Sequence, residues 1–124
     1  MTQLYDSFTP ATLNLPELLI RLDNDRELLS ELIILFQKKY PVLLRQLREY
    51  INVKDVIKIE STSHALKGML SCLSANQSVV LANRIEEMGR DGKTCGLPDA
   101  LTVFEGEVAK LLAELDRFAT KVGT

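Results

Sequence analysis

The sequence predicts an all-α protein, an antiparallel four-helix bundle with a short N-terminal capping helix. Apolar residues recur at alternating steps of three and four along leucine-rich stretches, which is the spacing of helices that pack nearly antiparallel. No stretch shows the period-two alternation of a β-strand. Glycines and prolines sit mostly between the periodic stretches, so they divide the chain into helices.

Length and composition bound the class of protein. A chain of 124 residues is the size of one domain, so we expect residues 1–124 to form a single bundle, a monomer whose core closes within one chain. A net charge of -2 argues against nucleic acid as a partner, because a phosphate backbone needs a positive surface. Without a membrane-length apolar run or a secretory pattern, we expect a cytoplasmic protein with no membrane partner and with Cys72 and Cys95 as free thiols.

A short first helix is predicted by "LNLPELLIRL", residues 13–22. Asn14 can cap this helix and Pro16 suits its first turn. The helix is too small for a full place in the core, so we expect it to cap one end of the bundle. Its apolar stripe consists of Leu18, Leu19 and Leu22.

A long second helix is predicted over residues 23–51, with Asp23 or Asn24 as its cap. Pro41 lies inside this pattern, where it removes one backbone donor and crowds the preceding turn. We therefore expect a kink there, or a break into two helices. The expected core stripe consists of Leu28, Leu32, Leu35, Phe36, Leu43, Leu47 and Tyr50.

Three further helices complete the predicted bundle. The first has Asn52 as its expected cap and buries Val56, Ile59, Ser63, Leu66, Leu70 and Leu73. The second runs over about residues 78–88 and buries Leu81, Ile85 and Met88. The last starts near Pro98 and buries Leu101, Phe104, Val108, Leu111, Leu115, Phe118 and Val122.

His64 is the single histidine of the chain, and it falls on the outer face of the helix that follows Asn52. At ~100° per residue it lies roughly 140° from the centre of the apolar stripe. A glycine in mid-helix costs about 1 kcal/mol relative to alanine, and no kink or cap requires Gly68, so its missing side chain would let another body approach the helix. Lys67 leans toward the flank, and the same outer face carries Ile57, Ser61, Gly68 and Ser71.

These residue types suit phosphoryl transfer. An exposed imidazole can act as a nucleophile through an unprotonated ring nitrogen. Lys67, one turn after His64, would place positive charge beside a phosphoryl group on that nitrogen. Such transfer needs in-line geometry and charge neutralisation more than an elaborate pocket, so a convex helix can serve if a partner supplies the rest.

The stretch "SHALKGMLSCLSA" resembles the signature of the histidine-containing phosphotransfer (HPt) domain. In that family the active histidine is followed by x-x-Lys-Gly and, about two turns on, by a pair of small residues. The stretches at residues 22–68 and "ANRIEEMGRDG" are also similar to the family's flanking pattern. Ser74 departs from it, because glycine is common at this position.

The resemblance implies an antiparallel four-helix bundle with additional N-terminal helical structure. It implies that His64 takes the phosphoryl group, that Lys67 helps to hold it and that Gly68 gives access to a receiver domain. Family members relay phosphoryl groups between aspartates of response-regulator receiver domains without binding ATP, and a hybrid sensor histidine kinase is a further candidate partner. No acidic cluster in the sequence could hold Mg²⁺, so we expect no cofactor here and place that ion in the receiver.

Three other interpretations compete with a relay. The bundle could be a noncatalytic interaction module with an idle His64, and transfer from a phosphorylated receiver would distinguish the two. An ATP-dependent histidine kinase is disfavoured, because the chain has no Gly-rich nucleotide loop and no room for an ATP-binding domain. A metal site is poorly supported, because in the sequence His64 has only Glu60 one turn before it.

Overall fold

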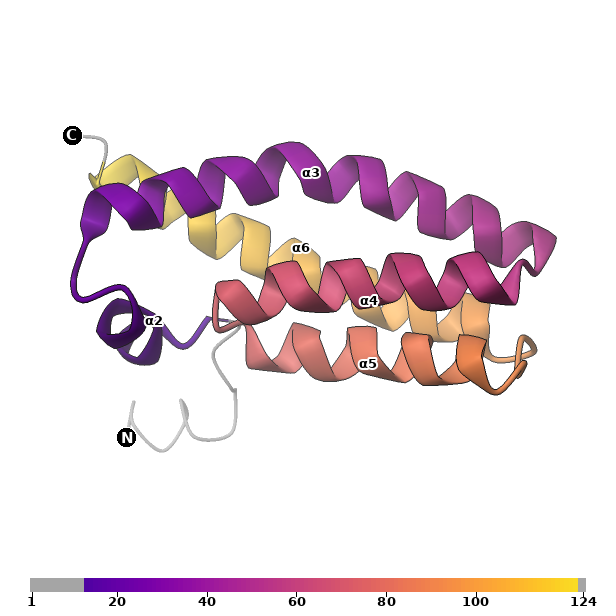
Figure 1. Cartoon of the computed structure of the whole chain (residues 1–124). Coiled ribbons are helices and arrows are strands. Elements are labelled where there is room, and N and C mark those ends of the chain that lie inside the picture. Colours follow the sequence, from indigo (N-terminus) through magenta and orange to yellow (C-terminus); the bar gives the residue numbers. More distant parts are fainter. Residues whose placement is uncertain (1–12, 123–124) are drawn as a thin grey trace, which may run out of the picture.

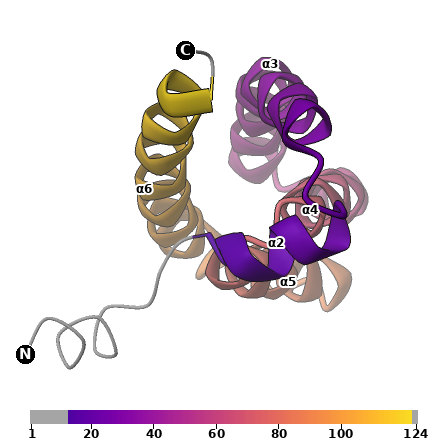
Figure 2. The ribbon, with the colours of Figure 1, turned by 90° about the vertical axis from the view of Figure 1, so that its left-hand side faces the viewer.

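The computed structural model describes residues 13–122, with side chains described up to residue 117. This part of the chain is all α-helical, which confirms the predicted fold class. Four helices run antiparallel along a common axis, and a short one lies across one end (Figures 1 and 2). In chain order they are α2 (Leu15–Arg21), α3 (Arg26–Val53), α4 (Val56–Cys72), α5 (Asn76–Arg90) and α6 (Leu97–Val122).

Helix α2 caps the bundle, as predicted. The Asn14 side chain accepts a hydrogen bond from the Glu17 N–H at 3.2 Å, and Leu18 is fully buried. The Asn14 N–H donates to the carbonyl of Ser74 at 3.1 Å. This bond ties the start of α2 to the turn between α4 and α5, at the end of the bundle seen in Figure 2.

The predicted cap of α3 is wrong by one or two residues. Asp25 is the N-cap, and its side chain accepts the Leu28 N–H at 3.0 Å. Asp23 and Asn24 have φ angles of 54° and 59°, so they form a left-handed turn that redirects the chain before the helix begins. Helix α3 then continues through Pro41 as one helix, bowed near its middle in Figure 1, so the predicted break does not occur.

The core stripe of α3 includes Phe36 and Leu47 as predicted, but elsewhere it is displaced by one residue, to Leu29, Ile33 and Ile51. Leu28 and Leu35 are 38% and 48% exposed. The run of apolar residues around them offers two stripes one position apart, and packing against the rest of the bundle selects the other one. The residues of α3 that are buried are Leu29, Ile33, Phe36, Tyr40, Leu47 and Ile51.

Helices α4 and α6 bury most of the residues that leucine spacing indicated, although Val56 is half-buried. In α5 only Ile85 of the three predicted core residues is buried, and Leu81 and Met88 are half-buried. Asp55 caps α4 by accepting the Lys58 N–H at 3.2 Å, whereas Asn52, the predicted cap, lies inside α3. Helix α5 is longer at both ends than predicted. Two predicted core residues of α6, Phe118 and Val122, have side chains that lie outside the described residues. The predicted core residues that are fully buried are Ile59, Ser63, Leu66, Leu70, Leu73, Ile85, Phe104, Val108, Leu111 and Leu115.

The turn between α4 and α5 depends on Ser74. Its φ angle is 53°, in the left-handed region that favours glycine, which accounts for glycine being common at this position in the family that the sequence resembles. The Arg21 Nη1 group donates to Ser74 Oγ at 3.0 Å and to the Ser71 carbonyl at 2.9 Å. Contacts with α2 therefore help to hold a strained turn.

No helix within residues 13–122 combines the length and the apolar character that crossing a membrane requires.

Candidate functional site

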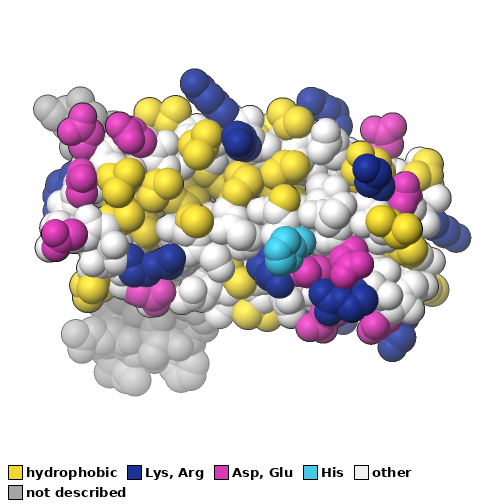
Figure 3. Space-filling view, in the orientation of Figure 1, with side chains coloured by type: hydrophobic (Ala, Val, Ile, Leu, Met, Phe, Trp, Pro, Cys, Tyr) yellow, Lys and Arg dark blue, Asp and Glu magenta, His cyan; other side chains and the backbone are white. Residues whose placement is uncertain are grey.

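His64 stands on the outer surface of α4, with 68% of its side chain exposed. Figure 3 shows it on an open face of the molecule, beside basic and acidic side chains. Ile57 is 75% exposed, and no atom lies within 4 Å of the position that a Cβ would take on Gly68. We call this surface the His64 face, and it consists of Ile57, Ser61, His64, Gly68 and Ser71, all of them exposed.

Glu86 of α5 fixes the orientation of the imidazole. Its Oε2 atom lies 2.9 Å from His64 Nδ1, and the Glu86 side chain is only 5% exposed. An ionised carboxylate can only accept, so Nδ1 carries the proton of this hydrogen bond. The neutral ring then presents the lone pair of Nε2, the nitrogen on the far side of the ring from Glu86.

Two basic side chains contact the same buried carboxylate. Lys67 Nζ lies 2.6 Å from Glu86 Oε1 and donates to Asn83 Oδ1 at 3.1 Å. Arg90 Nη2 donates to Glu86 Oε2 at 3.1 Å. The Lys67 side chain is 25% exposed, and its ammonium group already has an anionic partner in Glu86.

The balance of these contacts keeps Glu86 ionised. Burial by itself would raise the pKa of the Glu86 carboxyl, but its contacts with Lys67 and His64 outweigh burial and hold the pKa below its ordinary value. A lowered carboxyl pKa means a charged group at neutral pH. Glu86 is therefore an anionic acceptor for the His64 Nδ1–H.

Close packing of α4 on α5 brings Glu86 to His64. A Cβ on Gly89 would lie 3.0 Å from Ile59 Cγ2 and 3.1 Å from the Glu60 backbone nitrogen, so only glycine permits this approach. The buried residues of α5 recur at helical spacing as Ser78, Ala82, Ile85, Glu86 and Gly89. Leucine spacing alone gives Glu86 no role, although a carboxylate in line with three small residues is a signal of its burial against a neighbouring helix.

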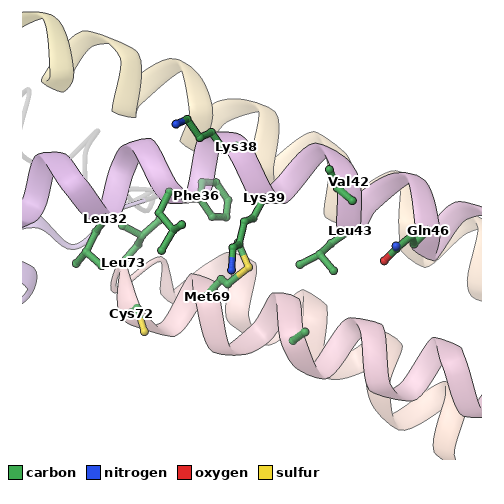
Figure 4. A pocket seen from close by; sticks show the side chains of 12 residues that line it. Leu32, Phe36, Lys38, Lys39, Val42, Leu43, Gln46, Met69, Cys72 and Leu73 are labelled. Carbon is green, nitrogen blue, oxygen red and sulfur yellow. The ribbon is translucent and has the colours of Figure 1, made fainter.

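An apolar groove lies beside the His64 face, between α3 and α4 (Figure 4). Its volume is about 620 Å³, and Ala65, the residue after His64, contributes to its wall. Lys38 and Lys39 also line it, and neither forms an ion pair within the described residues. Apolar side chains that line the groove include Leu32, Leu35, Phe36, Val42, Leu43 and Met69, and Figure 3 shows apolar side chains gathered over α3 and α4.

No group of three His, Cys, Asp or Glu side chains gathers as a metal site among the residues that the structure describes.

Fold and site together describe a helical bundle that presents one oriented, exposed histidine, the arrangement of a phosphotransfer domain. The family model of the Hpt domain matches residues 31–119, and the chain belongs to this family of phosphotransfer proteins. An Hpt domain acts as a phosphoryl carrier, and Hpt domains generally interact with receiver domains.

A solved structure shares the fold. The histidine-containing phosphotransfer protein B (HptB) from Pseudomonas aeruginosa PAO1 matches with a TM-score of 0.84 and 19% sequence identity. The match covers 91% of this chain and 98% of that chain. A comparison with curated proteins finds no match.

Proposed function

We propose that this protein relays a phosphoryl group between the aspartates of two response-regulator receiver domains, with His64 as the phosphoacceptor. The observation that carries the proposal is the contact between the exposed His64 ring and the buried Glu86 carboxylate. That contact holds the ring in one orientation and leaves Nε2 toward solvent, where a partner can reach it. We take residues 1–124 as one such domain, acting as a monomer, with a receiver or the receiver of a hybrid sensor histidine kinase as its partner.

The transfer itself needs no proton to move. The Nε2 lone pair of His64 attacks the phosphorus of the aspartyl phosphate in line, the P–O bond breaks, and its electron pair stays on the aspartate carboxylate. The ring becomes positively charged and keeps its Nδ1–H on Glu86. Reverse transfer to a second receiver restores the neutral imidazole.

Three residues of this chain have distinct parts in that step. His64 is the nucleophile, and Lys67 screens the phosphoryl charge. Glu86 is a positioning residue, because it acts through the His64 ring. It fixes the tautomer and opposes the positive charge that the ring acquires.

The His64 face supplies the docking surface. Gly68 leaves room for a receiver to approach the helix backbone, and Ile57, Ser61 and Ser71 surround it. The apolar groove extends this surface across α3. With Lys38 and Lys39 along the groove, we expect a partner that offers apolar side chains bordered by acidic ones.

Transfer from a phosphorylated receiver tests the proposal. The full chain is incubated with each member of a panel of phosphorylated receivers, and we expect rapid formation of acid-labile, base-stable phosphate on the chain. His64→Gln should abolish this label, and ATP without a receiver should give none. A folded wild-type chain that stays unlabelled by every receiver would favour the noncatalytic interaction module instead.

A further inference from the structure

If His64 takes a phosphoryl group, two anions compete for Lys67: the Glu86 carboxylate and the phosphoryl group. In the structure Lys67 Nζ lies against Glu86 Oε1 and Asn83 Oδ1. To screen a phosphoryl group on His64 Nε2, the ammonium group has to turn away from that carboxylate. A carboxylate that is 5% exposed and loses its counter-charge becomes costly, because buried charge without a partner is strongly destabilising.

We propose that Lys67 exchanges partners during transfer, from Glu86 to the phosphoryl group, and that Arg90 is the positioning residue that makes this exchange possible. The proposal rests on the phosphoacceptor role of His64. Arg90 holds Glu86 Oε2 at 3.1 Å, and this is the same oxygen that accepts the His64 Nδ1–H. It therefore stays on the carboxylate when Lys67 leaves.

The number of cations that face Glu86 stays the same through the exchange. Before transfer, Glu86 faces two cations, Lys67 and Arg90, and a neutral His64 ring. As the Nε2–P bond forms, the ring becomes an imidazolium whose Nδ1–H remains 2.9 Å from Oε2. Glu86 again faces two cations, the ring and Arg90, and Lys67 is released to the phosphoryl oxygens.

Arg90 is well placed for a holding role. Its Nε atom donates to Glu60 Oε2 at 2.9 Å, which anchors the guanidinium between α4 and α5. Its side chain is 53% exposed, so replacing it should not disturb the core. The charged or titratable groups that contact the Glu86 carboxylate are His64 and Lys67 from α4 and Arg90 from α5. Glu60 of α4 and Glu87 of α5 in turn lie close to Arg90.

A double-mutant cycle with a small phosphodonor tests the exchange without any receiver. The full chain is treated with phosphoramidate, and the rate of phosphohistidine formation is followed by ³¹P NMR in the wild type, Arg90→Gln, Lys67→Ala and the double variant. We expect each single variant to be slower by about tenfold. In the Arg90→Gln background, where Lys67 cannot leave Glu86, we expect Lys67→Ala to cost less than about threefold.

Two further variants separate this role from a structural one. Arg90→Lys should restore most of the rate, because it keeps a cation beside Glu86. Arg48→Gln is the matched control. Arg48 of α3 is 56% exposed and, like Arg90, donates two hydrogen bonds to carboxylate oxygens, here both on Glu105 of α6. The Arg48→Gln variant should leave the rate unchanged.

The outcomes distinguish this proposal from the relay itself. If the wild type is phosphorylated and the losses from Lys67→Ala and Arg90→Gln simply multiply, the exchange is wrong and the relay stands. If neither phosphoramidate nor any receiver labels His64, the relay fails and the exchange fails with it.

Discussion

Among single residues, Glu86 has the greatest influence on the chemistry open to His64. A buried carboxylate that accepts from Nδ1 removes the freedom of the ring to flip or to change tautomer. It also gives the ring an anionic partner just when phosphorylation would make it cationic. The imidazole is therefore exposed but held in one orientation, because its Nδ1 edge contacts Glu86, whose side chain is only 5% exposed.

The charge on Glu86 should make stability depend on pH. Its pKa in the folded protein is lowered by Lys67 and His64 despite burial, so the unfolded chain binds this proton more readily. The stabilisation is complete above the ordinary carboxyl pKa and is lost as the pH falls through the lowered folded pKa. We expect the free energy of unfolding, measured in urea across this acid range, to fall more steeply for the wild type than for Glu86→Gln. Parallel curves would contradict the assignment.

Helical periodicity was enough to predict that His64, Ile57 and Gly68 lie outside. Their place on the helix depends only on the residues of α4 itself. The contact between His64 and Glu86 joins residues 22 positions apart and depends on how α5 is rotated against α4. That rotation follows from the small side chains between the two helices, which a single-helix pattern does not reveal.

For the helices themselves, type and order could be predicted but local boundaries could not. Asp23, Asn24 and Asp25 are three consecutive side chains that can all accept an N-cap hydrogen bond, and only the left-handed turn at the first two singles out Asp25. Leu28 and Leu29 likewise begin two competing stripes. Such choices between neighbours are settled by tertiary packing, because local preferences are nearly equal.

Two glycines on neighbouring helices should respond oppositely to the same change. Gly89→Ala places a Cβ about 3 Å from Ile59 and from the Glu60 backbone, so we expect a loss of about 1–3 kcal/mol in the free energy of unfolding. Gly68→Ala meets no atom within 4 Å and should gain up to about 1 kcal/mol through helix propensity. Urea unfolding of both variants measures the difference, and equal effects would refute the close contact of α5 with α4.

Across the whole molecule, α2 covers the end of the bundle and leaves its side open. The His64 face and the apolar groove lie on one side formed by α3 and α4, and the same side shows the histidine in Figure 3. Helix α2 is held at the far end of α4 by Asn14 and Arg21. A visiting domain therefore meets no element of the described residues in front of His64.

Bulk on this open side should block docking without unfolding the protein. Gly68→Gln is expected to slow transfer from a receiver at least about tenfold, because the new side chain occupies the path to His64, while the fold is retained. Gly106→Gln on α6 is the matched control, since Gly106 is also exposed in mid-helix with no atom within 4 Å. Stopped-flow mixing with a phosphorylated receiver compares the transfer rates of the two variants. Equal rates for Gly68→Gln and Gly106→Gln would exclude Gly68 from the docking surface.

The exposure of the His64 ring has a consequence for how long a signal could last. With 68% of the side chain in solvent, a phosphoryl group on Nε2 would have no protein wall to keep bulk water away. Its lifetime would be set by the intrinsic hydrolysis of the nitrogen–phosphorus bond and by how soon an acceptor arrives. Such an exposed site is suited to rapid transfer of the phosphoryl group. A long-lived phosphohistidine would require a second protein to cover the site.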